Sequence, residues 1–228
     1  MNENHASMKE CAAEAARVVQ AVRPERLGDP TPCDEFDLRA LVNHLVLYTS
    51  HGLERRALRE ELPDELIERD FTTDAGWPQE YAAQLDRALA AWADPAAWDG
   101  DIGGTPAADI AAMMTLEMAL HGWDVARAAG QEYRVSPETG RFVLQVVEKH
   151  AEMYRQYDGF ADAVPLGADA PPFERAVAAS AATRTGTRPP AERVDLRRVV
   201  VIRAAITTTR RKSTRDGQAA MRQCPTSL

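Results

Sequence analysis

The chain has 228 residues, and 45% of them are hydrophobic, which is enough to bury one good core, so one main domain is expected. Its formal net charge is −8, but residues 1–180 hold sixteen Lys and Arg against thirty-two Asp and Glu, whereas residues 181–228 hold eleven against three. An acidic body argues against a nucleic-acid surface. The chain has neither an apolar run long enough to span a bilayer nor an N-terminal export signal, so we expect a cytoplasmic protein without nucleic-acid or membrane partners.

The first half of the chain predicts three helices. Ala, Val and charged residues alternate at helical spacing over residues 5–23 and stop before a proline. Asp34 or Asp37 can cap a second helix, which runs from residue 38 toward residue 60. Proline and polar residues then interrupt the pattern, and residues 79–92 form the third predicted helix.

The second half predicts two more helices. Thr105 followed by proline is a cap-and-first-turn signature that opens a fourth helix, and Gly130 is typical of its end. Ser136 followed by proline opens a fifth helix, which runs to about residue 156. No strand pattern or internal repeat stands out. The sequence therefore predicts an all-α protein in which four long antiparallel helices surround one core, with a fifth helix packed outside or completing the bundle.

Three polar side chains fall on the apolar faces of these helices. Glu117 and His121 are four residues apart, so they lie one turn above each other on the inward face, and His44 shares the apolar stripe of the second helix. Two imidazoles and one carboxylate that face a core suit a divalent metal such as zinc with at least one open position. The other interpretation is three buried polar groups that satisfy one another, and an E-x-x-x-H pair alone does not decide between the two.

Two segments carry a resemblance to a known family. TPCDEFDLRALVNHLV, followed later in the chain by LEMALHGWDVARAAG, resembles the DinB-type bundle family that includes mycothiol-dependent maleylpyruvate isomerases, and in particular its actinobacterial metal-binding members with an HGWD-x-A-x-A-x-G helix. The resemblance covers residues 8 to 180 and departs from the family at Phe36, where a tryptophan is expected. It implies a DinB-like antiparallel four-helix bundle with an additional helix, in which His44, Glu117 and His121 bind a divalent metal, with zinc as the favoured ion.

The resemblance also implies an activity. Similar proteins use the metal to activate a small thiol, mycothiol in actinobacteria, for addition to an electrophile or for isomerisation through a transient adduct. The Ala- and Arg-rich composition fits an actinobacterial source. We therefore expect a metal-dependent thiol S-transferase or maleylpyruvate isomerase-like enzyme whose partners are a small thiol and an electrophile, with a homodimer left open. The alternative is a non-catalytic protein that uses the same site to hold a metal or a small ligand.

Three further side chains are candidates for the surroundings of this site. Asp124 follows His121 by three residues and can accept a hydrogen bond from the ligand imidazole, or pair with the arginine three residues further on. His51 lies two α-helical turns after His44, with its Cα about 10 Å away, so it can line a pocket without sharing the metal, or be a half-exposed surface histidine. For Trp123 we favour a role in packing between helices over a role in the wall of a substrate pocket.

The chain divides at Ser180 into a metal-binding bundle domain, residues 1–180, and an irregular basic tail, residues 181–228. The family's closing segment is expected to continue into GRDP-x-W, but the sequence reads AATRTGTRP. A GC-rich coding of that segment, read with one added G, gives Gly-Arg-Asp-Pro-Asp-Trp-Asp-Pro. We therefore interpret the tail as the product of a shifted reading frame, and the other interpretation is an authentic disordered tail that contacts nucleic acid or an acidic partner.

Overall fold

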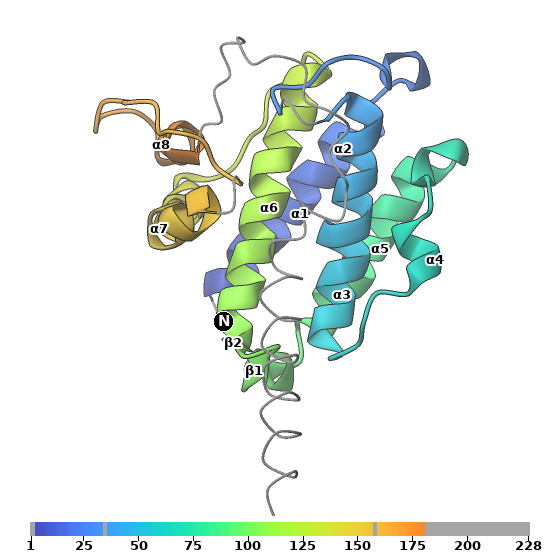
Figure 1. Cartoon of the computed structure of the whole chain (residues 1–228), viewed down its shortest axis with the longest axis horizontal. Coiled ribbons are helices and arrows are strands. Elements are labelled where there is room, and N and C mark those ends of the chain that lie inside the picture. Colours follow the sequence, from blue (N-terminus) through green and yellow to red (C-terminus); the bar gives the residue numbers. More distant parts are fainter. Residues whose placement is uncertain (1–2, 34–35, 157–158, 181–228) are drawn as a thin grey trace, which may run out of the picture. The chain divides into compact units, whose positions relative to one another are not determined.

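A computed structural model of the chain describes residues 3–33, 36–156 and 159–180 (Figure 1). The predicted basic tail, residues 181–228, lies outside the described residues, so both interpretations of it stay predictions. In chain order the elements are α1 (Glu3–Gln20), the 3-10 turn η1 (Pro24–Arg26), α2 (Leu38–His44), the π-helix η2 (Leu45–His51), α3 (Gly52–Ala57), α4 (Asp64–Ile67), η3 (Phe71–Thr73), α5 (Trp77–Ala91), η4 (Pro95–Trp98), the strands β1 (Asp101–Ile102) and β2 (Thr105–Pro106), α6 (Ala107–Ala128), α7 (Pro137–Gln156) and α8 (Pro172–Ser180). The prediction of an all-α architecture is confirmed for this part of the chain.

Most predicted helix ends have the expected chemistry. The Asp37 carboxylate accepts a hydrogen bond from the backbone N–H of Ala40 at 2.8 Å and caps α2. The Ser136 hydroxyl accepts from the N–H of Thr139 at 3.2 Å and caps α7. Gly130, with φ of +71°, adopts the left-handed conformation just after α6. Local sequence therefore sets these helix boundaries.

The start of the fourth long helix differs from the prediction. Thr105 does not cap α6, because it pairs with Ile102 in a two-residue antiparallel ladder, and α6 begins at Ala107. The reason is the Gly103-Gly104 turn, whose φ values of +62° and +87° are those that a tight hairpin favours. The hairpin uses the backbone of Thr105 before the helix can begin.

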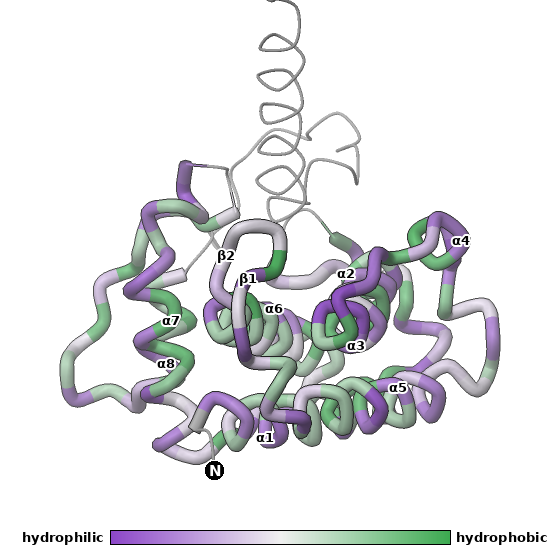
Figure 2. Tube along the Cα trace, turned by 90° about the horizontal axis from the view of Figure 1, so that it is seen from below, coloured by the Kyte–Doolittle hydropathy of each residue, from purple (hydrophilic) through white to green (hydrophobic). Residues whose placement is uncertain are grey.

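Four helical segments form a closed bundle: α1, α6, the continuous α2–η2–α3 helix and α5, each packed against the next and α5 against α1. Figure 2 shows α6 and α2–η2–α3 side by side over a layer made by α1 and α5. Their facing sides carry the apolar core, which includes Leu41, Ile110 and Leu116, each 1% exposed or less. Within the described residues, no helix is both long and apolar enough to cross a membrane.

The bundle contains two pairs of parallel helices, α1 with α6 and the α2–η2–α3 helix with α5. The two pairs run antiparallel to each other (Figure 1). The hydroxyl groups of Thr49 and Tyr81 lie 3.0 Å apart, and further along both helices the Trp92 indole N–H donates to the Leu53 carbonyl at 2.9 Å. Residue numbers thus increase together along α3 and α5, because the segment with α4 and η3 returns the chain to the other end of the bundle (Figure 1). The sequence pattern predicted the helices but not this crossover.

The second bundle helix, residues 38–57, changes its hydrogen bonding in the middle. The N–H of Gly52 donates to the carbonyl of Leu47, five residues back, which is the bond of a π-helix. The buried Thr49 hydroxyl donates to the Leu45 carbonyl at 2.8 Å, so side chains as well as backbone satisfy the carbonyls of this segment. A π-turn holds more residues than an α-turn, so the positions after it are rotated about the helix axis.

The predicted fifth helix, α7, packs on the outside of the bundle against α1 and α6. A further helix, α8, packs on α7 and was not predicted, although its residues belong to the segment that resembles the family. Gly140 permits this packing, because a Cβ there would lie 3.0 Å from the backbone nitrogen of Phe173 at the start of α8. The additional helical layer therefore covers one side of the bundle and does not enter its core.

Candidate metal centre

The bundle brings His44 from α2 together with Glu117 and His121 from α6. One ligand atom from each of the three residues lies within 4.8 Å of the others, and we refer to them as the His–Glu–His cluster. Glu117 Oε2 lies 3.3 Å from His121 Nε2 and 3.7 Å from His44 Nε2. The spacing of four residues on α6 and the inward stripe of α2 therefore place the side chains as the sequence predicted.

The cluster is largely shielded from solvent but not closed. The side chain of His44 is 8% exposed, and those of Glu117 and His121 are each 18% exposed. His44 Nε2 is buried and has no hydrogen-bond partner among the described residues. A buried polar atom without a partner costs free energy, so an additional ligand at this point would stabilise the folded protein.

The three groups perturb one another's protonation. Burial alone would raise the pKa of Glu117, but the two neighbouring imidazoles outweigh it and hold this pKa well below its usual range. Burial lowers the pKa of His44. Burial alone would also lower the pKa of His121, but hydrogen bonds to Asp124 and Glu117 raise it to about 10. Near neutral pH the metal-free cluster therefore holds a carboxylate, one imidazolium and one neutral imidazole.

Asp124 supports the cluster from behind. Its side chain is 2% exposed, and Oδ2 lies 3.3 Å from His121 Nδ1. Of the two roles that the sequence left open, the structure shows contact with the imidazole. A carboxylate on Nδ1 fixes the ring so that Nε2 points at Glu117, which is the usual arrangement behind a metal-binding histidine.

Aromatic rings enclose the two imidazoles. The ring centroid of Phe36 lies 5.4 Å from that of His44 and 6.3 Å from that of His121, and the ring of Tyr48 lies 4.9 Å from His44. Phe36, which is 6% exposed, occupies the position where relatives are expected to have tryptophan, so the exchange keeps an apolar wall. These rings limit the access of water and make the site less polar.

Two groups near Glu117 were not singled out from the sequence. Burial raises the pKa of Tyr154 well above its usual range, and the negative charge of Glu117 raises it further. Burial lowers the pKa of Arg56, while Tyr48 and Glu117 oppose this shift. A Cβ on Gly52 would lie 2.8 Å from Arg56 Nη1, so the glycine makes room for the guanidinium, which donates to the Gly52 carbonyl at 3.0 Å.

The structure shows aromatic contacts outside the His–Glu–His cluster for His51 and Trp123, the other two candidates for its surroundings. His51 does not share the face of His44, because the π-helix rotates it toward α5, where it stacks on Phe71 with ring centroids 5.5 Å apart. Trp123 is half-buried on α6, and the guanidinium of Arg127 lies 5.9 Å from its ring centroid. Neither side chain belongs to the His–Glu–His cluster.

The cluster comes close to the geometry that a divalent cation requires. Zinc ligands lie about 2.0 to 2.2 Å from the ion, so two of them can be at most about 4.4 Å apart. The largest separation in the cluster, 4.8 Å, is close to this limit, and small side-chain rotations would bring all three atoms into range. The donor set of two imidazoles and one carboxylate is that of catalytic zinc sites with an open position.

Fold and cluster together define a helical bundle with a candidate metal site between its helices. Residues 8–126, just over half of the chain, match the family described as the mycothiol maleylpyruvate isomerase N-terminal domain, and the chain belongs to this family. The predicted DinB-like fold is thereby confirmed. The chain is also similar to two Mycobacterium tuberculosis proteins, Uncharacterized protein Rv0738 of strain H37Rv and Uncharacterized protein MT0763 of strain CDC 1551. Each is 27% identical over 167 residues, which cover 72% of this chain and 88% of the relative. No solved structure matches the chain.

Proposed function

We propose that the protein is a zinc-dependent enzyme that uses a small thiol, mycothiol, for transfer to a small electrophile or for its isomerisation. The observation that carries the proposal is the His–Glu–His cluster, in which the buried Nε2 of His44 has no hydrogen-bond partner among the described residues. Membership in the family of mycothiol maleylpyruvate isomerase N-terminal domains supports the choice of thiol. The partners would be a thiol and an electrophile.

His44, Glu117 and His121 would hold the cation, and Asp124 would orient His121 for that role. A divalent cation bound here would lower the pKa of a coordinated thiol and hold it as thiolate near neutral pH. Glu117 and His121 are each 18% exposed, so a small molecule can reach the cluster from this side. Phe36, which packs against both imidazoles, would help to exclude water from them.

A second candidate function is non-catalytic binding of a metal or small ligand. It is favoured by the groups beside Glu117, because burial raises the pKa of Tyr154 well above its usual range, and an arginine such as Arg56 is effectively always protonated in proteins. Neither group is suited to exchange a proton with a substrate near pH 7. The two functions therefore differ in whether a bound ligand reacts.

The test is to mix the purified protein with zinc, mycothiol and a panel of electrophiles, and to measure thiol consumption and product formation. We expect turnover in the wild-type protein that is lost in His44→Ala. His150→Ala, which removes a histidine of α7 outside the cluster, should keep turnover. Tight zinc binding without turnover on any electrophile would favour the binding protein, and the absence of zinc binding would contradict both the zinc-dependent enzyme and the metal-binding form of the alternative.

A further inference from the structure

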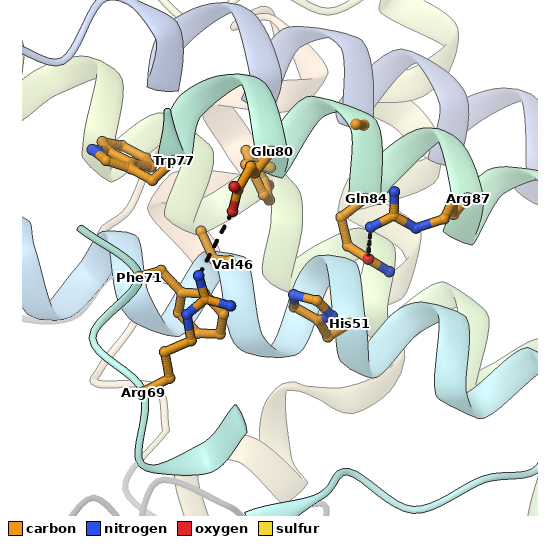
Figure 3. A pocket seen from close by; sticks show the side chains of 10 residues that line it. Val46, His51, Arg69, Phe71, Trp77, Glu80, Gln84 and Arg87 are labelled. Atoms are coloured by element: carbon orange, nitrogen blue, oxygen red, sulfur yellow. Dashed lines mark hydrogen bonds and ion pairs between the residues drawn. The ribbon is translucent and has the colours of Figure 1, made fainter. Parts of the chain in front are cut away.

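A cavity lies between η2 and α5, whereas the His–Glu–His cluster lies between α2 and α6. Its volume is about 210 Å³, and none of the residues that line it belongs to the cluster. Figure 3 shows side chains from η2, from α5 and from the segment around η3 converging on this space. The π-helix contributes to the cavity directly, because it turns His51 toward α5.

The inner wall of the cavity is aromatic. Phe71 and Trp77 are each 4% exposed, and Tyr81 is fully buried. The hydroxyl of Tyr81 is bonded to that of Thr49, so what Tyr81 offers the cavity is its ring. An engineered apolar cavity of about 150 Å³ accepts benzene. This cavity therefore has room for one six-membered ring with a small substituent.

The outer wall carries a guanidinium without a carboxylate partner. Arg87 donates to the side-chain oxygen of Gln84, and among the described residues it has no carboxylate within ion-pair distance. Gln84 is 3% exposed, and its amide N–H donates to Glu54 at 2.6 Å, so the glutamine is held in place. A neutral amide fixes Arg87 without neutralising it, and a fixed cation favours an anionic ligand.

The remaining polar groups complete the same side of the cavity. Arg69 lies 3.7 Å from Glu80 in a loose ion pair at the exposed rim, and its guanidinium is 5.1 Å from the Phe71 ring centroid. His51 stacks on Phe71 at an interplanar angle of 22°. Burial lowers the pKa of His51, and Arg87 lowers it further, so the imidazole is neutral near pH 7 and can donate one hydrogen bond.

We propose that this cavity binds a small aromatic carboxylate. The ring would lie against Trp77 and Tyr81, and the carboxylate would accept hydrogen bonds from Arg87 and His51. The aromatic wall favours a ligand with an apolar body over a bare inorganic anion, and the uncompensated guanidinium favours a carboxylate over a neutral ring. Because no lining residue belongs to the His–Glu–His cluster, binding requires no metal.

The probe is benzoate, titrated into the full chain after removal of metal with a chelator and followed by calorimetry and by the indole N–H signals in NMR spectra. We expect a dissociation constant on the order of 1 mM. Benzamide, which has the same ring but no charge, should bind at least about tenfold more weakly, and inorganic phosphate should not compete.

Arg87→Gln should weaken benzoate binding at least about tenfold, because it removes a charged hydrogen-bond donor. The matched control is Arg141→Gln on α7, which removes an exposed arginine that pairs with Glu138 and should leave the affinity unchanged. Arg87 is exposed, so its replacement should not affect folding, which a thermal melt verifies.

Several results would overturn the proposal: absence of benzoate binding at about 20 mM, equal affinity in Arg87→Gln, or equal affinity for benzamide. Benzoate binding that appears only after zinc is added would also overturn it, because the carboxylate would then be at the metal cluster. Zinc-independent binding would support the aromatic carboxylate site whether or not the His–Glu–His cluster proves catalytic.

Discussion

Asp124→Asn tests how the carboxylate behind His121 controls the candidate metal site. The substitution keeps the size of a side chain that is 2% exposed and removes the charge that lies 3.3 Å from His121 Nδ1. Loss of such a carboxylate typically weakens metal binding about 10- to 100-fold, or about 1.4 to 2.7 kcal/mol, because the imidazole becomes a weaker base and is held less firmly.

A second effect acts in the opposite direction at neutral pH. The pKa of His121 is raised to about 10, so a metal ion must displace a proton from it, at a cost that grows by about 1.4 kcal/mol for each pH unit below that value. At pH 7 this competition weakens binding by about a thousandfold, or about 4 kcal/mol. Asp124→Asn removes one of the hydrogen bonds that raise the pKa of His121, so in the variant the metal ion competes less strongly with a proton for this imidazole.

The affinity difference between the two proteins should therefore widen as the pH rises. We expect the wild-type zinc affinity to increase about tenfold per pH unit between pH 6.5 and 8.5, and that of Asp124→Asn to level off at a lower pH. Competition with a coloured chelator at several pH values measures the affinities, and calorimetry in buffers of different ionisation enthalpy measures the protons released. Asp109→Asn, which alters a surface carboxylate of the same helix bonded to Lys149, is the control. Equal affinities and equal proton release at all pH values would refute the role assigned to Asp124.

Three other outcomes follow from the geometry. Glu117→Gln should reduce zinc binding at least about 100-fold, measured by the same competition, and a metal content equal to that of the wild type would show that the carboxylate is not a ligand. In metal-free protein, protonated His121 stabilises the fold fully at pH values below 6.5, the pKa of the unfolded state. This stabilisation is lost as the pH rises through about 10, the pKa in the folded state, so the free energy of urea unfolding should fall over that window. A flat profile would argue against a protonated His121. Gly122→Ala should lower the free energy of unfolding by about 1 to 3 kcal/mol, because the new Cβ would lie 2.7 Å from Tyr133 Cε2, whereas Gly28→Ala, with no neighbour within 4 Å, serves as the control.

The sequence predicted the helices and the inward placement of His44, Glu117 and His121, since both depend on local periodicity. Glu117 and His121 are one turn apart on the apolar face of α6, and that spacing alone directs both toward the core. His44 shares the buried face of α2 with Leu41, so once the helices pack it must face another helix of the bundle. The end of α6 and the start of α7 likewise follow from Gly130 and Ser136.

Other features depend on contacts between distant segments, and the sequence pattern did not predict them. The π-helix turns His51 away from His44 and into a separate cavity, because one wider turn changes the face of every residue after it. Tyr154 comes close to Glu117 only through the packing of α7 on the bundle, which the helical period of α7 does not specify. Periodicity thus determined which residues point inward. Tertiary packing decided which inward residues meet, because the direction and rotation of each helix are set by its neighbours.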